Sequence, residues 1–195
     1  MEPREPTTGI SNRVGLIGLL LVQAFIGYEW FMSGITKIVR GGFPSGLADE
    51  LRDKSPGTVG WYKSFLDGSV IPNATAFGYL IEIGELLIGI ALVAAALVWL
   101  FSWQRLPSGG RVALLLVAAL ASFGAIFMNV NFHLANTSAH PWFIPKDGFD
   151  EGVDLDSLMP AIELVLLAVS TSFLVALRRR TKRPLRVGRP RAHRA

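Results

Sequence analysis

The chain has 195 residues, of which 51% are hydrophobic and only 17% charged, and its mean hydropathy is +0.42. A soluble domain of this length carries more charge and fewer unbroken apolar runs, so the composition excludes an ordinary water-soluble domain and indicates a membrane protein with several spans. The chain contains no cysteine, which excludes disulfides, thiolate chemistry, cysteine-ligated iron–sulfur clusters and covalent c-type haem.

The N-terminal part of the chain predicts a short tail followed by a first membrane helix. Residues 1–13 are polar and contain two prolines, so we expect a disordered cytoplasmic tail. The next apolar run predicts a helix at about 14–39, which is too long and lacks the cleavage pattern for a signal peptide. Glu29, Ser33 and Lys37 recur every four residues and therefore form a polar stripe on its later half.

The connection from residue 40 to residue 71 predicts an amphipathic interfacial loop. Phe43, Leu47 and Leu51 recur at four-residue intervals between charged residues, which is typical of a short helix lying on the membrane surface. An aromatic cluster at 61–65 is typical of an interfacial anchor. A lid packed over the mouth of the helix bundle is the alternative interpretation.

A second membrane helix is predicted at about 74–103, and it carries two acidic residues. Glu82 and Glu85 are three residues apart, so they lie on one face of the helix. A charged side chain at the centre of a membrane helix costs about 2.5 kcal/mol or more. We therefore expect this face to be directed at other helices and away from lipid.

Two further membrane helices are predicted at about 112–134 and 156–177. The third carries Asn129 and His133 near its end, and the fourth carries Glu163 near its start. The five tryptophans of the chain are mostly typical of an aromatic belt at the membrane surface. The predicted fold class is all-α, an integral membrane bundle of four helices covering residues 14–177.

The distribution of basic residues predicts the orientation of this bundle. Nine of the 19 Lys and Arg lie in the tail 178–195. A basic tail directly after an apolar helix favours a topology signal, or contact with anionic lipid headgroups, over nucleic acid. Four spans place both termini on one side, which then holds thirteen Lys and Arg against six on the other. The positive-inside rule predicts a multi-pass protein of the cell membrane with both termini in the cytoplasm.

In this topology the ionisable residues within the predicted spans all fall in the outer half of the bundle, which predicts a polar cavity open to the outside. We predict Glu85, Glu82 and Lys37 as catalytic residues, because buried carboxyl groups are suited to exchange protons with a quinone or quinol. Six further residues are predicted to contact substrate: Glu29, Ser33, Arg40, Asn129, His133 and Glu163. Lys37 and Arg40 would attract an anion such as an oxidised sulfur species. In the alternative interpretation Lys37 and Glu85 only pair across two helices and fix their register.

No metal, haem or flavin motif is present in the sequence. His133 would need a second ligand to hold a metal or haem, and the other histidines, His140 and His193, fall in a predicted loop and in the tail. Quinone is therefore the only cofactor that the sequence suggests. The oligomeric state is left open.

Two segments resemble motifs of the DoxX family of small four-helix membrane proteins, and within it the DoxD-like branch associated with thiosulfate–quinone oxidoreductase. They are Phe31-Met-Ser-Gly-Ile-Thr-Lys-Ile38 and Glu82-x-x-Glu85-Leu-Leu-Ile-Gly89-Ile-Ala-Leu92. Lys37, Glu85 and Gly89 are the positions of this chain that match the family's motifs. The resemblance implies a membrane subunit of a quinone-linked oxidoreductase that oxidises thiosulfate or a related sulfur species with a small partner subunit. A non-catalytic membrane scaffold for soluble redox or stress-response proteins is the alternative.

Overall fold

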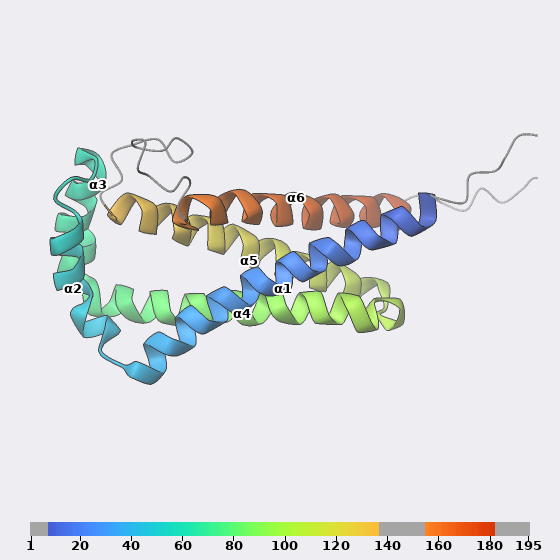
Figure 1. The fold of residues 1–195 in the computed structure, drawn as a ribbon, viewed down its shortest axis with the longest axis horizontal. Coiled ribbons are helices and arrows are strands. Elements are labelled where there is room, and N and C mark those ends of the chain that lie inside the picture. The colour runs from blue at the N-terminus through green and yellow to red at the C-terminus, as the bar shows by residue number, and fades with distance from the viewer. Residues whose placement is uncertain (1–7, 137–154, 182–195) are drawn as a thin grey trace, which may run out of the picture.

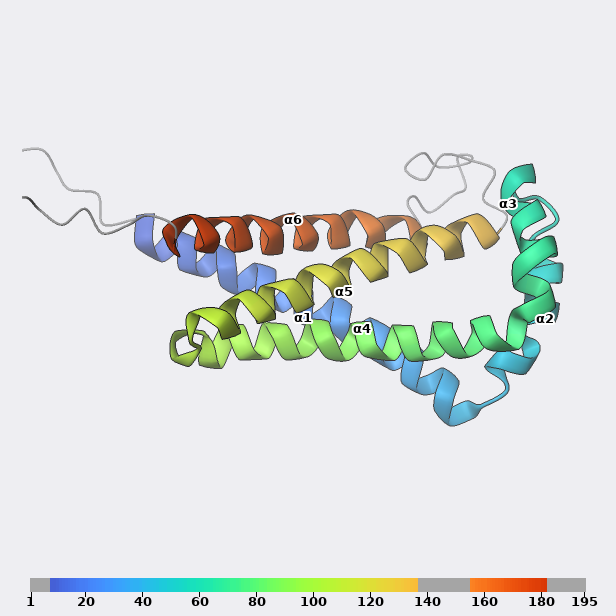
Figure 2. The same cartoon turned by 180° about the vertical axis from the view of Figure 1, so that it is seen from behind.

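The computed structural model describes residues 8–136 and 155–181, and every regular element in these two ranges is helical (Figure 1). Four long helices run along the molecule: α1 (Thr8–Arg40), α4 (Ala74–Ser102), α5 (Ser108–Ala135) and α6 (Leu155–Thr181). Figures 1 and 2 show α4 and α6 at opposite edges, with α1 crossing obliquely over one face and α5 over the other. The start of α1, the turn between α4 and α5, and the end of α6 share one end of the bundle.

Four helical segments of the described chain are long and apolar enough to cross a membrane. They are Arg13–Arg40, Gly60–Arg105, Ser108–Ala135 and Leu158–Arg179. Large apolar side chains, such as Phe25, Leu80 and Leu120, are exposed along these segments, and lipid is a favourable environment for them. The prediction of an all-α, multi-pass membrane bundle is confirmed.

The helix boundaries differ slightly from the prediction at both ends of the chain. α1 begins at Thr8 and includes residues predicted as tail, because no proline between Pro6 and Pro44 interrupts it. α6 continues to Thr181, and its last turns carry arginines, which are favourable at the negative end of a helix. The rest of the two predicted tails, 1–7 and 182–195, lies outside the described residues.

The core is formed where all four long helices meet. Its buried members are Ile26, Trp30, Ile88, Leu92, Ala121, Ala125, Met159 and Leu166. Small residues on α5, including Ala118, Ser122 and Ala125, are fully or almost fully buried, so neighbouring helix backbones can approach closely.

One end of the bundle is covered by a helical cap, which we define as residues 43–73 (Figures 1 and 2). It comprises α2 (Phe43–Lys54), α3 (Gly60–Phe65), the π-helical turn η1 (Leu66–Val70) and the 3-10 turn η2 (Ile71–Asn73), which leads directly into α4. Gly41 and Gly42 have positive φ angles of 68° and 81°, which permits the sharp reversal between α1 and α2.

The predicted amphipathic helix is present as α2, but its apolar face packs on the protein itself. Leu47 and Leu51 are buried in one cluster with Tyr62 and Leu66. This supports the lid interpretation, because the apolar face of α2 is taken up by the protein and is not offered to the membrane surface. In the aromatic segment Tyr62 is buried, whereas Trp61 and Phe65 are exposed.

We expect Leu47→Ala to loosen the cap and to lower the free energy of unfolding by about 2–5 kcal/mol, because it removes a buried side chain from a packed cluster. The measurement is unfolding in mixed detergent micelles followed by circular dichroism. Asp49→Ala on the exposed face of α2 is the control, with an expected change within about 0.5 kcal/mol. Equal losses in both variants would contradict the buried position of Leu47.

Candidate functional site: a cavity beneath the helical cap

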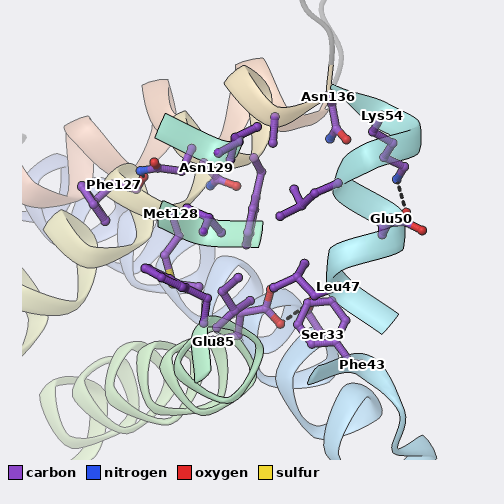
Figure 3. Close-up of a pocket in the computed structure, with 18 of the residues that line it drawn as sticks. Ser33, Phe43, Leu47, Glu50, Lys54, Glu85, Phe127, Met128, Asn129 and Asn136 are labelled. Atoms are coloured by element: carbon purple, nitrogen blue, oxygen red, sulfur yellow. Dashed lines mark hydrogen bonds and ion pairs between the residues drawn. The ribbon is translucent and has the colours of Figure 1, made fainter. Parts of the chain in front are cut away.

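A cavity of about 420 Å³ lies between the cap and the helices α1, α4 and α5 (Figure 3). Its volume is within the range of roughly 300–1,000 Å³ that is usual for small-molecule sites. Much of its wall is apolar and includes Phe43, Leu47, Phe127 and Met128. The remaining wall contains polar residues, and two hydrogen-bonded clusters that include some of them connect different sets of helices.

The first cluster joins α1 and α4 and consists of Ser33, Lys37 and Glu85. The Lys37 ammonium nitrogen lies 2.6 Å from Oε2 and 2.8 Å from Oε1 of Glu85. It also donates to the Ser33 hydroxyl at 2.7 Å, which in turn donates to Glu85 Oε2 at 2.9 Å. The side chain of Glu85 is 1% exposed and that of Lys37 is 24% exposed. All three residues line the cavity, so the cluster offers it both hydrogen-bond donors and an acceptor.

Two glycines allow this cluster to form, because they let α1 and α4 pack backbone to backbone. A Cβ on Gly34 would meet the backbone of Leu86, and a Cβ on Gly89 would overlap the backbone of Phe31. The first helix therefore packs against the second, as the pairing of Lys37 with Glu85 requires. This geometry is equally compatible with the alternative interpretation, in which the pair fixes the register of the two helices.

The second cluster consists of Trp30, Asn129 and Glu163 and joins α1, α5 and α6. The Trp30 indole N–H donates to Glu163 Oε1 at 2.8 Å. The Asn129 amide nitrogen donates to the same carboxylate at 3.0 Å and 3.1 Å. Glu163 is completely buried, and it is Trp30 and Asn129 that line the cavity. Glu163 therefore influences the cavity indirectly, because it orients the Trp30 and Asn129 side chains whose hydrogen bonds it accepts.

The structure brings some of the predicted residues to the cavity and places others elsewhere. Lys37, Glu85, Glu29, Ser33 and Asn129 line it. The four predicted residues outside the lining are Glu82, Arg40, His133 and Glu163.

Glu82 differs most from the prediction. It is buried on the side of α4 that packs against α1, where its carbonyl oxygen lies beside Gly34. Residues three apart on a helix point in directions that differ by about 60°, because each residue turns by about 100°. Glu85 therefore reaches the cavity, and Glu82 remains within the contact between the two helices. Arg40 is exposed at the end of α1, and His133 is buried on α5.

Three polar side chains that connect separate helices were not predicted as functional residues. Trp30 is buried and is not part of a surface belt. It lies three residues before Ser33 and seven before Lys37, and this helical spacing could have indicated that it shares their face. The Tyr62 hydroxyl donates to Asn131 Oδ1 at 3.0 Å and connects the cap to α5. The Gln23 amide donates to the carbonyl of Leu92 at 3.0 Å, between α1 and α4.

Chemically, the cavity can hold a small amphipathic molecule. A flat apolar ring fits the aromatic and aliphatic wall, and polar ring substituents fit the Lys37–Ser33–Glu85 cluster. No group of three or more His, Asp or Glu suited to a metal ion occurs within residues 8–136 and 155–181.

Comparison with protein-family models, with curated proteins and with solved structures finds no match for this chain. The fold and the site define the class of protein: a multi-pass helical membrane protein with a cavity beneath a helical cap, whose wall contains a buried carboxylate paired with a lysine. The resemblance to the DoxX family rests on the two sequence motifs alone.

Proposed function

We propose that the chain is the quinone-binding membrane subunit of an oxidoreductase that oxidises thiosulfate or a related sulfur species. The observation that carries this proposal is the buried Glu85 carboxylate, held by Lys37 and Ser33 in the wall of an apolar cavity. A quinone has an apolar ring and oxygens that take up protons on reduction, so it needs both features of this cavity. Two of the three positions that carry the DoxX resemblance, Lys37 and Glu85, form this cluster, and the third, Gly89, allows α1 to approach.

The proposed reaction balances without any further reactant. Two thiosulfate ions form one new S–S bond, give tetrathionate and release two electrons, and reduction of a quinone to its quinol takes up two electrons and two protons. The Glu85 carboxylate would take a proton from water and pass it to the nearer ring oxygen, while Lys37 and Ser33 would donate hydrogen bonds to that oxygen. The second proton would reach the other ring oxygen from water. A small partner subunit completes the complex in this proposal.

We infer the orientation from the basic end of the bundle. Arg13, Arg105, Arg111, Arg178 and Arg179 belong to the start of α1, the α4–α5 turn and the end of α6, which share the end opposite the cap. The positive-inside rule then places this end in the cytoplasm of a cell-membrane protein and the cavity in the outer half of the bilayer. The basic tail 178–195 would meet anionic lipid headgroups at the inner surface.

The scaffold function is a second candidate, and one observation favours it. Lys37 and Glu85 join α1 to α4 next to the closest backbone contact, where a purely structural ion pair would also lie. In this case removal of the basic tail would abolish recovery of partner proteins, and Glu85→Gln would leave recovery unchanged.

The test is quinone reduction by the purified protein with thiosulfate as donor, with candidate partner subunits added. We expect Glu85→Gln to lower the rate by about a hundredfold or more, because general acid–base groups contribute this much. Asp67→Asn is the matched control, since Asp67 also pairs with a lysine but is exposed and lies outside the cavity. No reduction by the wild type with any partner, or equal rates in Glu85→Gln, would overturn the proposal.

A further inference from the structure

The side of the cavity lined by Trp30 of α1 and by Asn129 and Asn131 of α5 uses its side-chain donors within the protein. The side-chain nitrogens of Trp30, Asn129 and Asn131 all donate to groups of the protein itself. The Trp30 and Asn129 donors are taken by Glu163. The Asn131 amide nitrogen donates to the carbonyl of Phe127 at 2.7 Å, and its Oδ1 accepts from Tyr62.

Glu163 also determines which end of the Asn129 amide can contact a ligand in the cavity. A carboxylate only accepts hydrogen bonds, so the amide nitrogen must be the end that faces it. The amide oxygen is then the end left for another partner, on a side chain that lines the cavity (Figure 3). This wall therefore presents an acceptor, whereas the Lys37–Ser33–Glu85 wall presents both donors and an acceptor.

From this asymmetry we propose that the Trp30–Asn129–Glu163 cluster makes the cavity bind the hydroxylated quinol form of the ring more tightly than the quinone form. A quinol hydroxyl can donate to Asn129 Oδ1, whereas a quinone carbonyl at the same place would face another acceptor. The opposite wall accommodates either form, so Asn129 determines the preference and Glu163 is a positioning residue. This inference rests on the proposed function, because it concerns the ligand of the same cavity.

The preference has a consequence for electron transfer. One hydrogen bond gained or lost corresponds to a preference of about tenfold in the dissociation constant. For a two-electron couple, tenfold tighter binding of the reduced form raises the midpoint potential of the bound quinone by about 30 mV. The protein would thus make its bound quinone a better electron acceptor than the quinone free in the membrane.

The experiment measures dissociation constants of decylubiquinone and of its quinol, under argon, with the full-length protein in lipid nanodiscs. We expect the wild type to bind the quinol about tenfold more tightly. In Glu163→Gln the side-chain oxygen still accepts from Trp30, and the new NH₂ group replaces Oε2, the second acceptor of the Asn129 nitrogen at 3.1 Å. Two nitrogen donors then face each other, which favours turning of the Asn129 amide so that its oxygen accepts from the new NH₂ group. The Asn129 nitrogen then faces the cavity, and the preference should disappear or reverse in favour of the quinone.

Two further variants keep the test decisive if Glu163→Gln folds poorly. Glu163→Asp retains a carboxylate and should retain the preference for the quinol, whereas Asn129→Leu should bind both forms equally. Equal binding by the wild type, or an unchanged ratio in Glu163→Gln and Asn129→Leu, would overturn this inference even while Glu85→Gln still abolishes quinone reduction. Failure of the wild type to bind either ring form would overturn the proposed function itself.

Discussion

Lys37→Met is expected to lower the free energy of unfolding by about 3 kcal/mol, because it leaves the buried Glu85 carboxylate without its counter-ion. Removal of one partner of a buried pair usually costs about 3–5 kcal/mol. The lower end of this range applies here, since Lys37 is 24% exposed and Ser33 still donates a hydrogen bond to Glu85. Unfolding by detergent titration, followed by circular dichroism, measures the loss.

The double variant Lys37→Met, Glu85→Leu separates the structural role of this pair from its chemical role. Replacement of both charges by apolar side chains of similar size is often neutral or stabilising, so we expect most of the lost stability to return. Quinone reduction should stay at the level of Glu85→Gln, because the proton-exchanging group is still absent. A double variant that is stable and fully active would give the pair a purely structural role and would overturn Glu85 as the proton-exchanging group.

The membrane fold and part of the site could be predicted from the sequence because both depend on local physical constraints. An apolar run long enough to cross the bilayer is a helix whatever its neighbours are, since its backbone groups must be satisfied within the segment. Glu85 in such a run has to face protein, and the stripe of Ser33 and Lys37 supplies the natural partners. The pairing of the first two membrane helices therefore follows from the positions of these three residues in the sequence.

The parts that could not be predicted depend on the rotation of each helix about its axis and on contacts distant in sequence. The backbone contact at Gly34 and Gly89 fixes the rotation of α4, which leaves Glu82 in the helix contact while Glu85 reaches the cavity. Trp30 packs in the core of the four long helices, and its N–H is accepted by Glu163, 133 positions further along the chain. Likewise, the pattern of α2 fits a membrane surface and a protein surface equally well, and only its packing against the rest of the cap decides between them.

Gly89→Ala is expected to destabilise the protein by about 3 kcal/mol, because its added methyl group would overlap the backbone of Phe31. A backbone atom cannot move aside as a flexible side chain does, so α1 as a whole must shift away from α4. Gly18→Ala on α1 is the matched control, since a Cβ there has nothing within 4 Å. It should stabilise the helix by about 0.5–1 kcal/mol, the usual gain from replacing glycine within a helix.

The same displacement should also weaken the ion pair, since Lys37 is carried by α1 and Glu85 by α4. A double-mutant cycle on Lys37 and Glu85 should therefore give a smaller coupling energy in the Gly89→Ala background than in the wild type. Quinone reduction should fall in parallel, because the cavity lies between the same two helices. If Gly89→Ala lowered the stability but left the Lys37–Glu85 coupling energy unchanged, α1 would tilt about this ion pair without separating from α4. The ion pair, and not the glycine contact, would then set the distance between these two helices.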